Sequence, residues 1–154
     1  MGSGILRKIR RNRSAALNVC RGRKRENKLQ TKFPFNDLVS ALKEFKLPCA
    51  PSRESEIELR LVLFLESRKF PVKEQISFKT GRLDVVVGPY IIEVKKLAGK
   101  GIVEQLDRYS GLCEGLIVVC WRASDPLKLI FAMEKASARI PVELIEVRNT
   151  CRIV

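Results

Sequence analysis

Hydrophobic and polar positions alternate with two different periods along residues 52–147. Helical spacing covers three segments, residues 52–69, 102–112 and 124–138. Short β-branched or continuous apolar runs cover residues 72–78, 81–87, 90–96, 116–121 and 142–147. The predicted order is therefore helix, three strands, helix, strand, helix, strand. This order predicts an α/β fold with a mixed central β-sheet flanked by helices.

A further short helix is expected before this block. Apolar side chains recur at helical spacing at Leu38, Ala41, Leu42 and Phe45, and Pro48 ends the pattern. We expect its apolar face to dock on the main domain or on a second subunit, and residues 46–53 to form a linker. The chain then divides into residues 1–50, a basic arm with a short amphipathic helix, and residues 51–154, one folded domain.

A β-hairpin carries the candidate chemistry. Gly88-Pro89 separates two β-branched runs and predicts a tight turn, which would place Asp84 opposite Glu93. Side chains alternate along a strand, so Lys95 is expected on the face of Glu93. Like charges directly opposite each other destabilise a sheet, which favours a cation between these two acids. Carboxylates are the hard oxygen ligands that suit Mg²⁺ or Mn²⁺.

The same residues carry a resemblance to a known family. Asp84 followed by Glu93-Val94-Lys95 resembles the Asp…Glu-x-Lys signature of the PD-(D/E)XK nuclease superfamily. The segment Gln105-Leu106-Asp107-Arg108-Tyr109 resembles the Gln-Leu-x-Arg-Tyr segment of NucS-type archaeal endonucleases. The close resemblance spans residues 81–109, and a looser one extends over residues 54–147. It implies a restriction-endonuclease-like fold, in the order α-β-β-β-α-β-α-β, and a divalent metal cofactor.

The resemblance also implies roles for individual residues. Asp84, Glu93 and the backbone carbonyl of Val94 would hold the metal. Lys95 would orient or deprotonate the attacking water and offset charge on the phosphate, and Gln105 would hydrogen-bond near the site. For Gln105 alone, a plain amide on the helix surface is about as well supported.

The resemblance implies a third acid near the metal, carried by the helix over residues 52–69. The candidates are Glu54, Glu56 and Glu58. We choose Glu58 as a catalytic and metal-binding residue, because it borders the apolar face of the helix and its distance to Phe70 resembles the corresponding helix of archaeal Holliday-junction resolvases. Carboxylates near a helix N-terminus also occur without any such role.

The charge is strongly asymmetric along the chain. The net charge is +13, and residues 1–32 hold eleven Lys or Arg and a single acid, Glu26. A localised positive segment favours a polyanionic partner, with nucleic acid ahead of a membrane. Candidate phosphate contacts in this arm are Arg10, Arg11, Arg23, Lys24 and Arg25. Those beside the hairpin are Arg82, Lys96, Lys100 and Arg108.

Absent residue types exclude several enzyme classes. The chain has no histidine, which rules out Ser-His and Cys-His catalysis and histidine zinc sites. Its five cysteines form no Cys-x-x-Cys pair, which favours reduced thiols in an intracellular protein, cytoplasmic or nucleoid-associated. We find neither a secretory signal nor an apolar run of the ~20 residues that a membrane span needs.

The sequence therefore favours a divalent-metal-dependent endonuclease. The resemblance implies branched, mismatched or single-stranded DNA as substrate, and RNA stays open. A dimeric Holliday-junction resolvase is one alternative. The others are a nucleic-acid-binding protein that has a nuclease-like fold without activity, and a packaging protein that uses only its basic arm.

Overall fold

The computed structural model describes residues 33–78, 81–99 and 101–150. The helices are α2 (Phe35–Lys43), α3 (Glu54–Ser67), α4 (Ile102–Ser110) and α5 (Pro126–Ser137). The strands are β1 (Lys46–Leu47), β2 (Val72–Phe78), β3 (Gly81–Val87), β4 (Tyr90–Ala98), β5 (Gly115–Ala123), β6 (Val142–Glu146) and β7 (Arg148–Asn149). The candidate phosphate contacts Arg10, Arg11, Arg23, Lys24, Arg25 and Lys100 lie outside the described residues.

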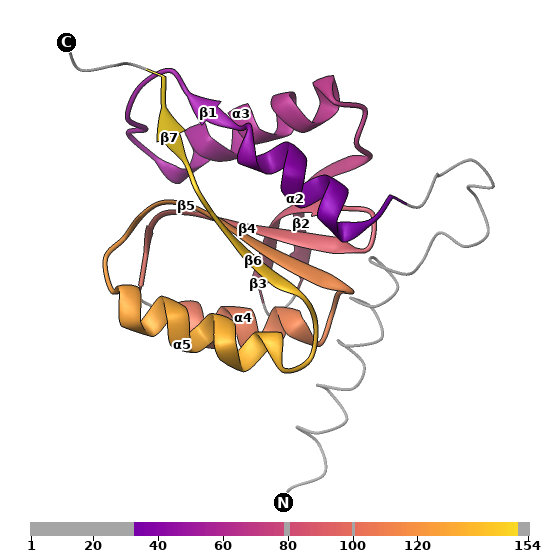
Figure 1. Ribbon diagram of the computed structural model, residues 1–154, viewed down its shortest axis with the longest axis vertical. Coiled ribbons are helices and arrows are strands. Elements are labelled where there is room, and N and C mark those ends of the chain that lie inside the picture. Colours follow the sequence, from indigo (N-terminus) through magenta and orange to yellow (C-terminus); the bar gives the residue numbers. More distant parts are fainter. Residues whose placement is uncertain (1–32, 79–80, 100, 151–154) are drawn as a thin grey trace, which may run out of the picture.

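A five-stranded mixed sheet forms the middle layer. Its strand order is β2-β3-β4-β5-β6, in which β3 is antiparallel to both of its neighbours and β4, β5 and β6 are parallel. Helices α2 and α3 cover one face and α4 and α5 the other (Figure 1). The predicted α/β fold with a mixed central sheet and flanking helices is confirmed.

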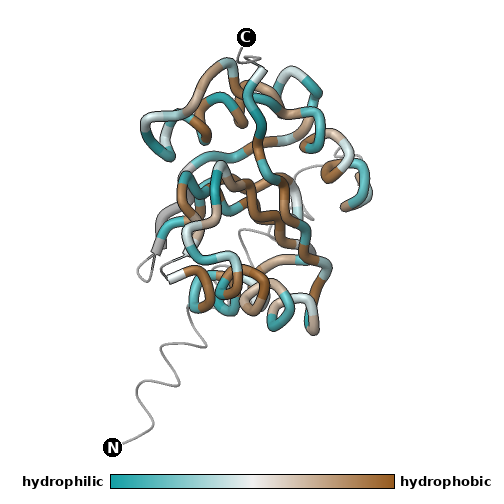
Figure 2. The backbone as a smooth tube through the Cα atoms, turned by 60° about the vertical axis from the view of Figure 1, so that its left-hand side comes forward, coloured by the Kyte–Doolittle hydropathy of each residue, from teal (hydrophilic) through white to brown (hydrophobic). Residues whose placement is uncertain are grey.

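Two apolar layers hold the helices on the sheet. On one face, Ile92 and Val94 of β4 share a core with Ile57 and Leu61 of α3. On the other face, Ile91 shares a core with residues of α4 and α5. Strands β4 and β5 are thus buried on both sides, as their continuous apolar runs require. Figure 2 shows hydrophobic residues concentrated along these central strands.

The hairpin of β3 and β4 turns where the sequence places it. Gly88 has φ = 58°, in the left-handed region that a residue without a Cβ adopts readily. Val87 pairs with Tyr90, and Val85 with Ile92, which is the predicted register.

The expectation of a linker over residues 46–53 is wrong at its first two residues. Lys46 and Leu47 form β1, which pairs in parallel with Arg148 and Asn149 of β7. A strand of two residues has no periodicity to detect, and its partner lies about a hundred residues further along the chain. Helix α2 packs into the same core as α3, so residues 35–47 belong to the folded body.

The described part of the chain contains free cysteines and only short or polar helices. No disulfide joins the cysteines that the structure describes, which are Cys49, Cys113 and Cys120. Within the described ranges, every helix is too short or too polar to cross a bilayer.

The packing of α2 is testable with a pair of leucine variants. Leu42 is fully buried in the core, whereas Leu59 on α3 is 57% exposed. Leu42→Ala should lower the free energy of unfolding by about 2–5 kcal/mol, because it leaves a cavity. Leu59→Ala should change it by no more than about 0.5 kcal/mol. Urea unfolding measures both, and equal effects would mean that α2 is not part of the core.

Candidate active site

The site begins where β3 and β4 separate. Their ladder ends at the pair Val85–Ile92, so the predicted direct pairing of Asp84 with Glu93 does not form. Instead, the Asp84 carboxylate accepts a hydrogen bond from the backbone N–H of Val94 over 3.0 Å. Leu83 and Val85 pack on opposite faces of the sheet, whereas they would share one face in a regular strand. The β3–β4 ladder thus stops one residue before Asp84, and at this gap in the pairing the Asp84 side chain takes the place of a backbone partner for the Val94 N–H.

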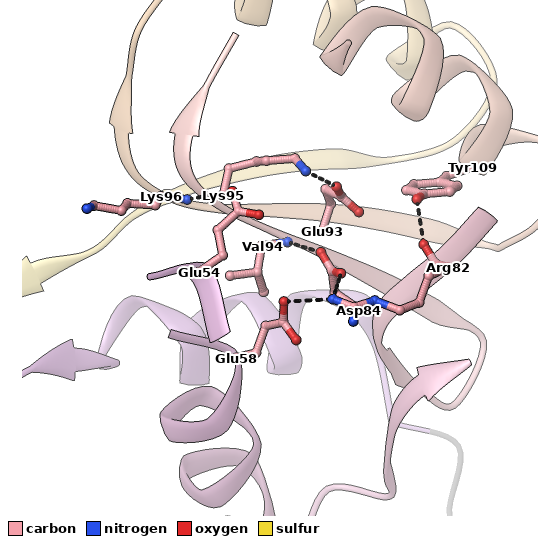
Figure 3. A network of polar contacts seen from close by, with 9 residues as sticks. All are labelled: Glu54, Glu58, Arg82, Asp84, Glu93, Val94, Lys95, Lys96 and Tyr109. Atoms are coloured by element: carbon pink, nitrogen blue, oxygen red, sulfur yellow. Dashed lines mark hydrogen bonds and ion pairs between the residues drawn. The ribbon is translucent and has the colours of Figure 1, made fainter. Parts of the chain in front are cut away.

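Three acids from three elements are buried around this gap. Glu58 on α3 is 7% exposed, Asp84 on β3 is 8% exposed and Glu93 on β4 is 1% exposed. They are three of the four buried polar or charged residues in the described part of the chain, the fourth being Ser110. Figure 3 shows Asp84 between the other two acids. Burial of a carboxylate is costly unless the charge is compensated, so this concentration requires a chemical reason.

Within the described part of the chain, only one of the two carboxylate oxygens of Glu93 has a positively charged partner. Its Oε1 lies 2.8 Å from the Lys95 ammonium, as the predicted shared face requires. Its Oε2 is buried and has no hydrogen-bond partner among the described residues. Burial, reinforced by the negative charge of Asp84, raises the pKa of Glu93 to about 7. The charges of Asp84 and Glu93 thus act on each other, although their strands are no longer paired there.

Lys95 stays positively charged in this setting. Burial by itself lowers its pKa, but the charges of Glu93, Glu54 and Asp84 outweigh burial and raise the pKa above its usual value. The ammonium is therefore a fixed positive charge beside the acids at neutral pH.

Arg82 supplies a second cation. Its Nη2 atom lies 3.3 Å from Glu58 Oε1 and 3.5 Å from Asp84 Oδ1, so one guanidinium bridges two acids (Figure 3). The backbone carbonyl of Arg82 accepts a hydrogen bond from the Tyr109 hydroxyl over 3.0 Å. Helix α4 thus fixes the backbone of β3 next to the gap.

The three candidate acids of α3 have different partners. Glu56 accepts hydrogen bonds from the backbone and hydroxyl of Ser52 and so stabilises the start of α3. Glu54 accepts from the backbone N–H of Lys96 over 3.1 Å and ties the helix to β4. Glu58, the predicted one, is buried and linked through Arg82 to Asp84.

Helix α4 contributes Gln105 and Tyr109, one turn apart. The Gln105 Oε1 atom is buried without a hydrogen-bond partner among the described residues. Burial and the charge of Glu93 raise the pKa of Tyr109, so its hydroxyl remains a donor. The sequence motif by itself gives Tyr109 no role, although its spacing of four residues from Gln105 places both on one helix face.

The predicted phosphate contacts are only partly available. The Lys96 ammonium donates to the carbonyl of Ser52 over 2.8 Å, so it reinforces the junction with α3. Arg108 is exposed, and its guanidinium lies 5.2 Å from the centre of the Tyr109 ring. Arg82 is half-exposed but engaged with Glu58 and Asp84.

The donor set at the gap fits a divalent cation. Asp84 and Glu93 supply carboxylates, and the uncompensated Oε2 of Glu93 is a ready ligand. The N–H of Val94 points at Asp84, and in a strand the C=O of a residue points to the same side as its N–H, which adds a carbonyl. Residues 33–78, 81–99 and 101–150 contain no group of three or more His, Cys, Asp or Glu arranged for a metal. Arg82 contacts both Glu58 and Asp84.

An apolar groove elsewhere has no comparable chemistry. It lies between α3 and the segment after β1, and its lining includes Leu47, Leu59 and Leu63. Its acid, Glu56, is already bonded to Ser52. We therefore place the candidate active site at the gap between β3 and β4.

Comparisons with known proteins add no identification. No protein-family model, curated protein or solved structure matches this chain.

The raised pKa of Glu93 predicts how stability depends on pH. Glu93 titrates near its ordinary value of 4.5 in the unfolded chain and at about 7 in the folded protein. The unfolded state therefore releases this proton first as the pH rises. In EDTA, the free energy of unfolding should fall by about 3 kcal/mol between roughly pH 4.5 and pH 7 because of this group.

Urea unfolding across this pH range tests the prediction with two glutamate variants. Glu93→Gln should remove most of the fall. Glu56→Gln should retain it, because Glu56 is exposed and its pKa is lowered by hydrogen bonds from Ser52. Parallel pH profiles for the wild type and Glu93→Gln would contradict the assignment.

Proposed function

We propose that the protein is a divalent-metal-dependent endonuclease that hydrolyses phosphodiester bonds in DNA. The observation that carries this proposal is the burial of Glu93 beside Asp84 with one carboxylate oxygen uncompensated. Such an arrangement lowers stability by itself, and a bound cation would offset the cost. Mg²⁺ or Mn²⁺ suits the oxygen donors present.

The order of elements supports a restriction-endonuclease-like interpretation of the fold. From α3 to β6 the chain runs helix, three strands, helix, strand, helix, strand. The acids and the lysine of the Asp…Glu-x-Lys pattern come from the second and third of these strands, and Gln105 from the next helix. This agreement between local pattern and topology makes a chance match of the pattern less plausible.

Asp84 and Glu93 would hold the metal through their carboxylates, together with the Val94 carbonyl. A bound divalent ion polarises the scissile phosphate and lowers the pKa of a water molecule. The hydrogen bond from Val94 N–H to Asp84 fixes the orientation of that carboxylate before any ligand arrives. Glu58 lies further out and holds Arg82 against Asp84.

Lys95 would act through its charge. Its raised pKa keeps it an ammonium, so of the two roles left open by the sequence we favour stabilisation of negative charge on the phosphate over removal of a proton from water. Glu93 Oε1, at 2.8 Å, holds the ammonium in place. Gln105 would orient water or Lys95 from α4.

Nucleic-acid binding would use charges around the site and in the arm. Arg108 is exposed beside Tyr109 and would contact a phosphate. Such contacts position the backbone and read no bases. The basic residues 1–32 would add sequence-independent affinity.

A cleavage assay with matched variants tests the activity. Plasmid, single-stranded and branched DNA are incubated with Mg²⁺, Mn²⁺ or EDTA. Wild-type protein should cut in the metals and not in EDTA. Asp84→Asn and Lys95→Ala should each lose at least about a hundredfold in rate, because each removes metal binding or charge stabilisation.

Controls separate loss of chemistry from loss of binding. Glu56→Gln should cut at the wild-type rate, since Glu56 only stabilises the start of α3. Asp84→Asn should still bind DNA. A wild type that binds every substrate and cuts none would favour the non-catalytic alternative, and paired symmetric cuts in a four-way junction would identify a resolvase.

The arm is tested by deletion of residues 1–32. Because the arm holds eleven of the 30 Lys and Arg, its loss should weaken DNA binding and flatten the dependence of affinity on salt. Fluorescence anisotropy at several salt concentrations measures both quantities. An unchanged slope of log affinity against log salt would refute a role for the arm in phosphate contact.

A further inference from the structure

Arg82 occupies the position from which a metal ion would have to reach Glu58 and Asp84 together. One nitrogen, Nη2, contacts both acids, at 3.3 Å and 3.5 Å (Figure 3). A single positive charge shared by two carboxylates is the electrostatic equivalent of a bound cation. Among the described residues, the three buried acids are not arranged as one metal cluster.

The Arg82 side chain is able to leave without disturbing the fold. Its side chain is 48% exposed, against 9% for Glu58 and 11% for Asp84. Both contacts are longer than the ~2.7–2.9 Å of strong charge-assisted hydrogen bonds. The backbone is anchored separately, because the Tyr109 hydroxyl donates to the Arg82 carbonyl over 3.0 Å. The Arg82 guanidinium is therefore weakly held, whereas the backbone that carries it is fixed in place.

We propose that Arg82 is a resident counter-ion that exchanges between the acids and the nucleic acid. In the metal-free protein it neutralises Glu58 and Asp84. A divalent ion competes with it for Asp84, and the displaced guanidinium pairs with a phosphate next to the site. This inference rests on the proposed metal-dependent nuclease function and adds a positioning role for one residue.

The exchange couples metal binding to nucleic-acid binding. A metal ion bound at Asp84 frees Arg82 to pair with a phosphate, and a phosphate that pairs with Arg82 frees Asp84 for the metal ion. Each ligand should therefore raise the affinity of the protein for the other ligand. By thermodynamic linkage the two factors are equal. The protein would then load its metal preferentially on the substrate.

Calorimetry of Mn²⁺ binding without DNA is the first test. Arg82→Gln removes the competing charge at similar size, and Mn²⁺ should bind at least about fivefold more tightly. The matched control is Arg60→Gln, which removes an exposed arginine from α3 and should change the affinity by less than about twofold. Thermal unfolding of both variants verifies that they are folded.

Coupling is the second test, with Ca²⁺ as a probe and a fluorescein-labelled branched oligonucleotide. Ca²⁺ should raise the oligonucleotide affinity of the wild type, and the oligonucleotide should raise the Ca²⁺ affinity by the same factor. Both effects should shrink to about onefold in Arg82→Gln. Should that variant not fold, the wild-type measurement decides alone, and the absence of coupling overturns the proposal.

The outcomes separate this proposal from the one on which it rests. Mn²⁺ binding that disappears in Asp84→Asn but is unchanged in Arg82→Gln overturns only the role of Arg82. No Mn²⁺ binding to the wild type overturns the metal site and the exchange together. Tighter Mn²⁺ binding in Arg82→Gln, with loss of coupling, supports both.

Discussion

The constraint on which the site depends is the burial of two carboxylates, Asp84 and Glu93, on neighbouring strands. Burial, reinforced by the negative charge of Asp84, raises the pKa of Glu93 to about 7, and the Glu93 Oε2 atom has no hydrogen-bond partner among the described residues. Folding tolerates this cost because β4 is the middle strand of the sheet, and its neighbouring residues Ile92 and Val94 are locked into the core. The apolar packing of its neighbours thus keeps the Glu93 carboxyl group out of contact with water, at a cost in free energy.

Two positively charged side chains, Lys95 and Arg82, stabilise the buried acids in different ways. Lys95 compensates one oxygen of Glu93 from within the same strand, and its contact is short. Arg82 compensates Asp84 and Glu58 from a half-exposed position through longer contacts. Lys95 is therefore held more closely than Arg82, which is the division of roles that the proposed binding of a metal ion and a polyanion would require.

Local sequence signals predicted the elements and most of the residues of the site. The Gly88-Pro89 turn fixed the hairpin register, and strand alternation put Lys95 on the face of Glu93. Long-range features were not predictable from periodicity. The ladder of β3 and β4 stops before Asp84, and β1 pairs with β7 about a hundred residues further along the chain. The bridge from Arg82 to Glu58 requires α3 to lie over the hairpin.

The central claim is that the buried acids form a divalent cation site. Its most direct test is a crystal structure of the protein grown with Mn²⁺ and measured at a wavelength that gives manganese an anomalous signal. The account predicts an anomalous peak that contacts the carboxylates of Asp84 and Glu93 and the carbonyl of Val94, at the ~2.0–2.2 Å typical of small divalent ions. A well-ordered gap with no peak, in crystals that contain millimolar Mn²⁺, would contradict it.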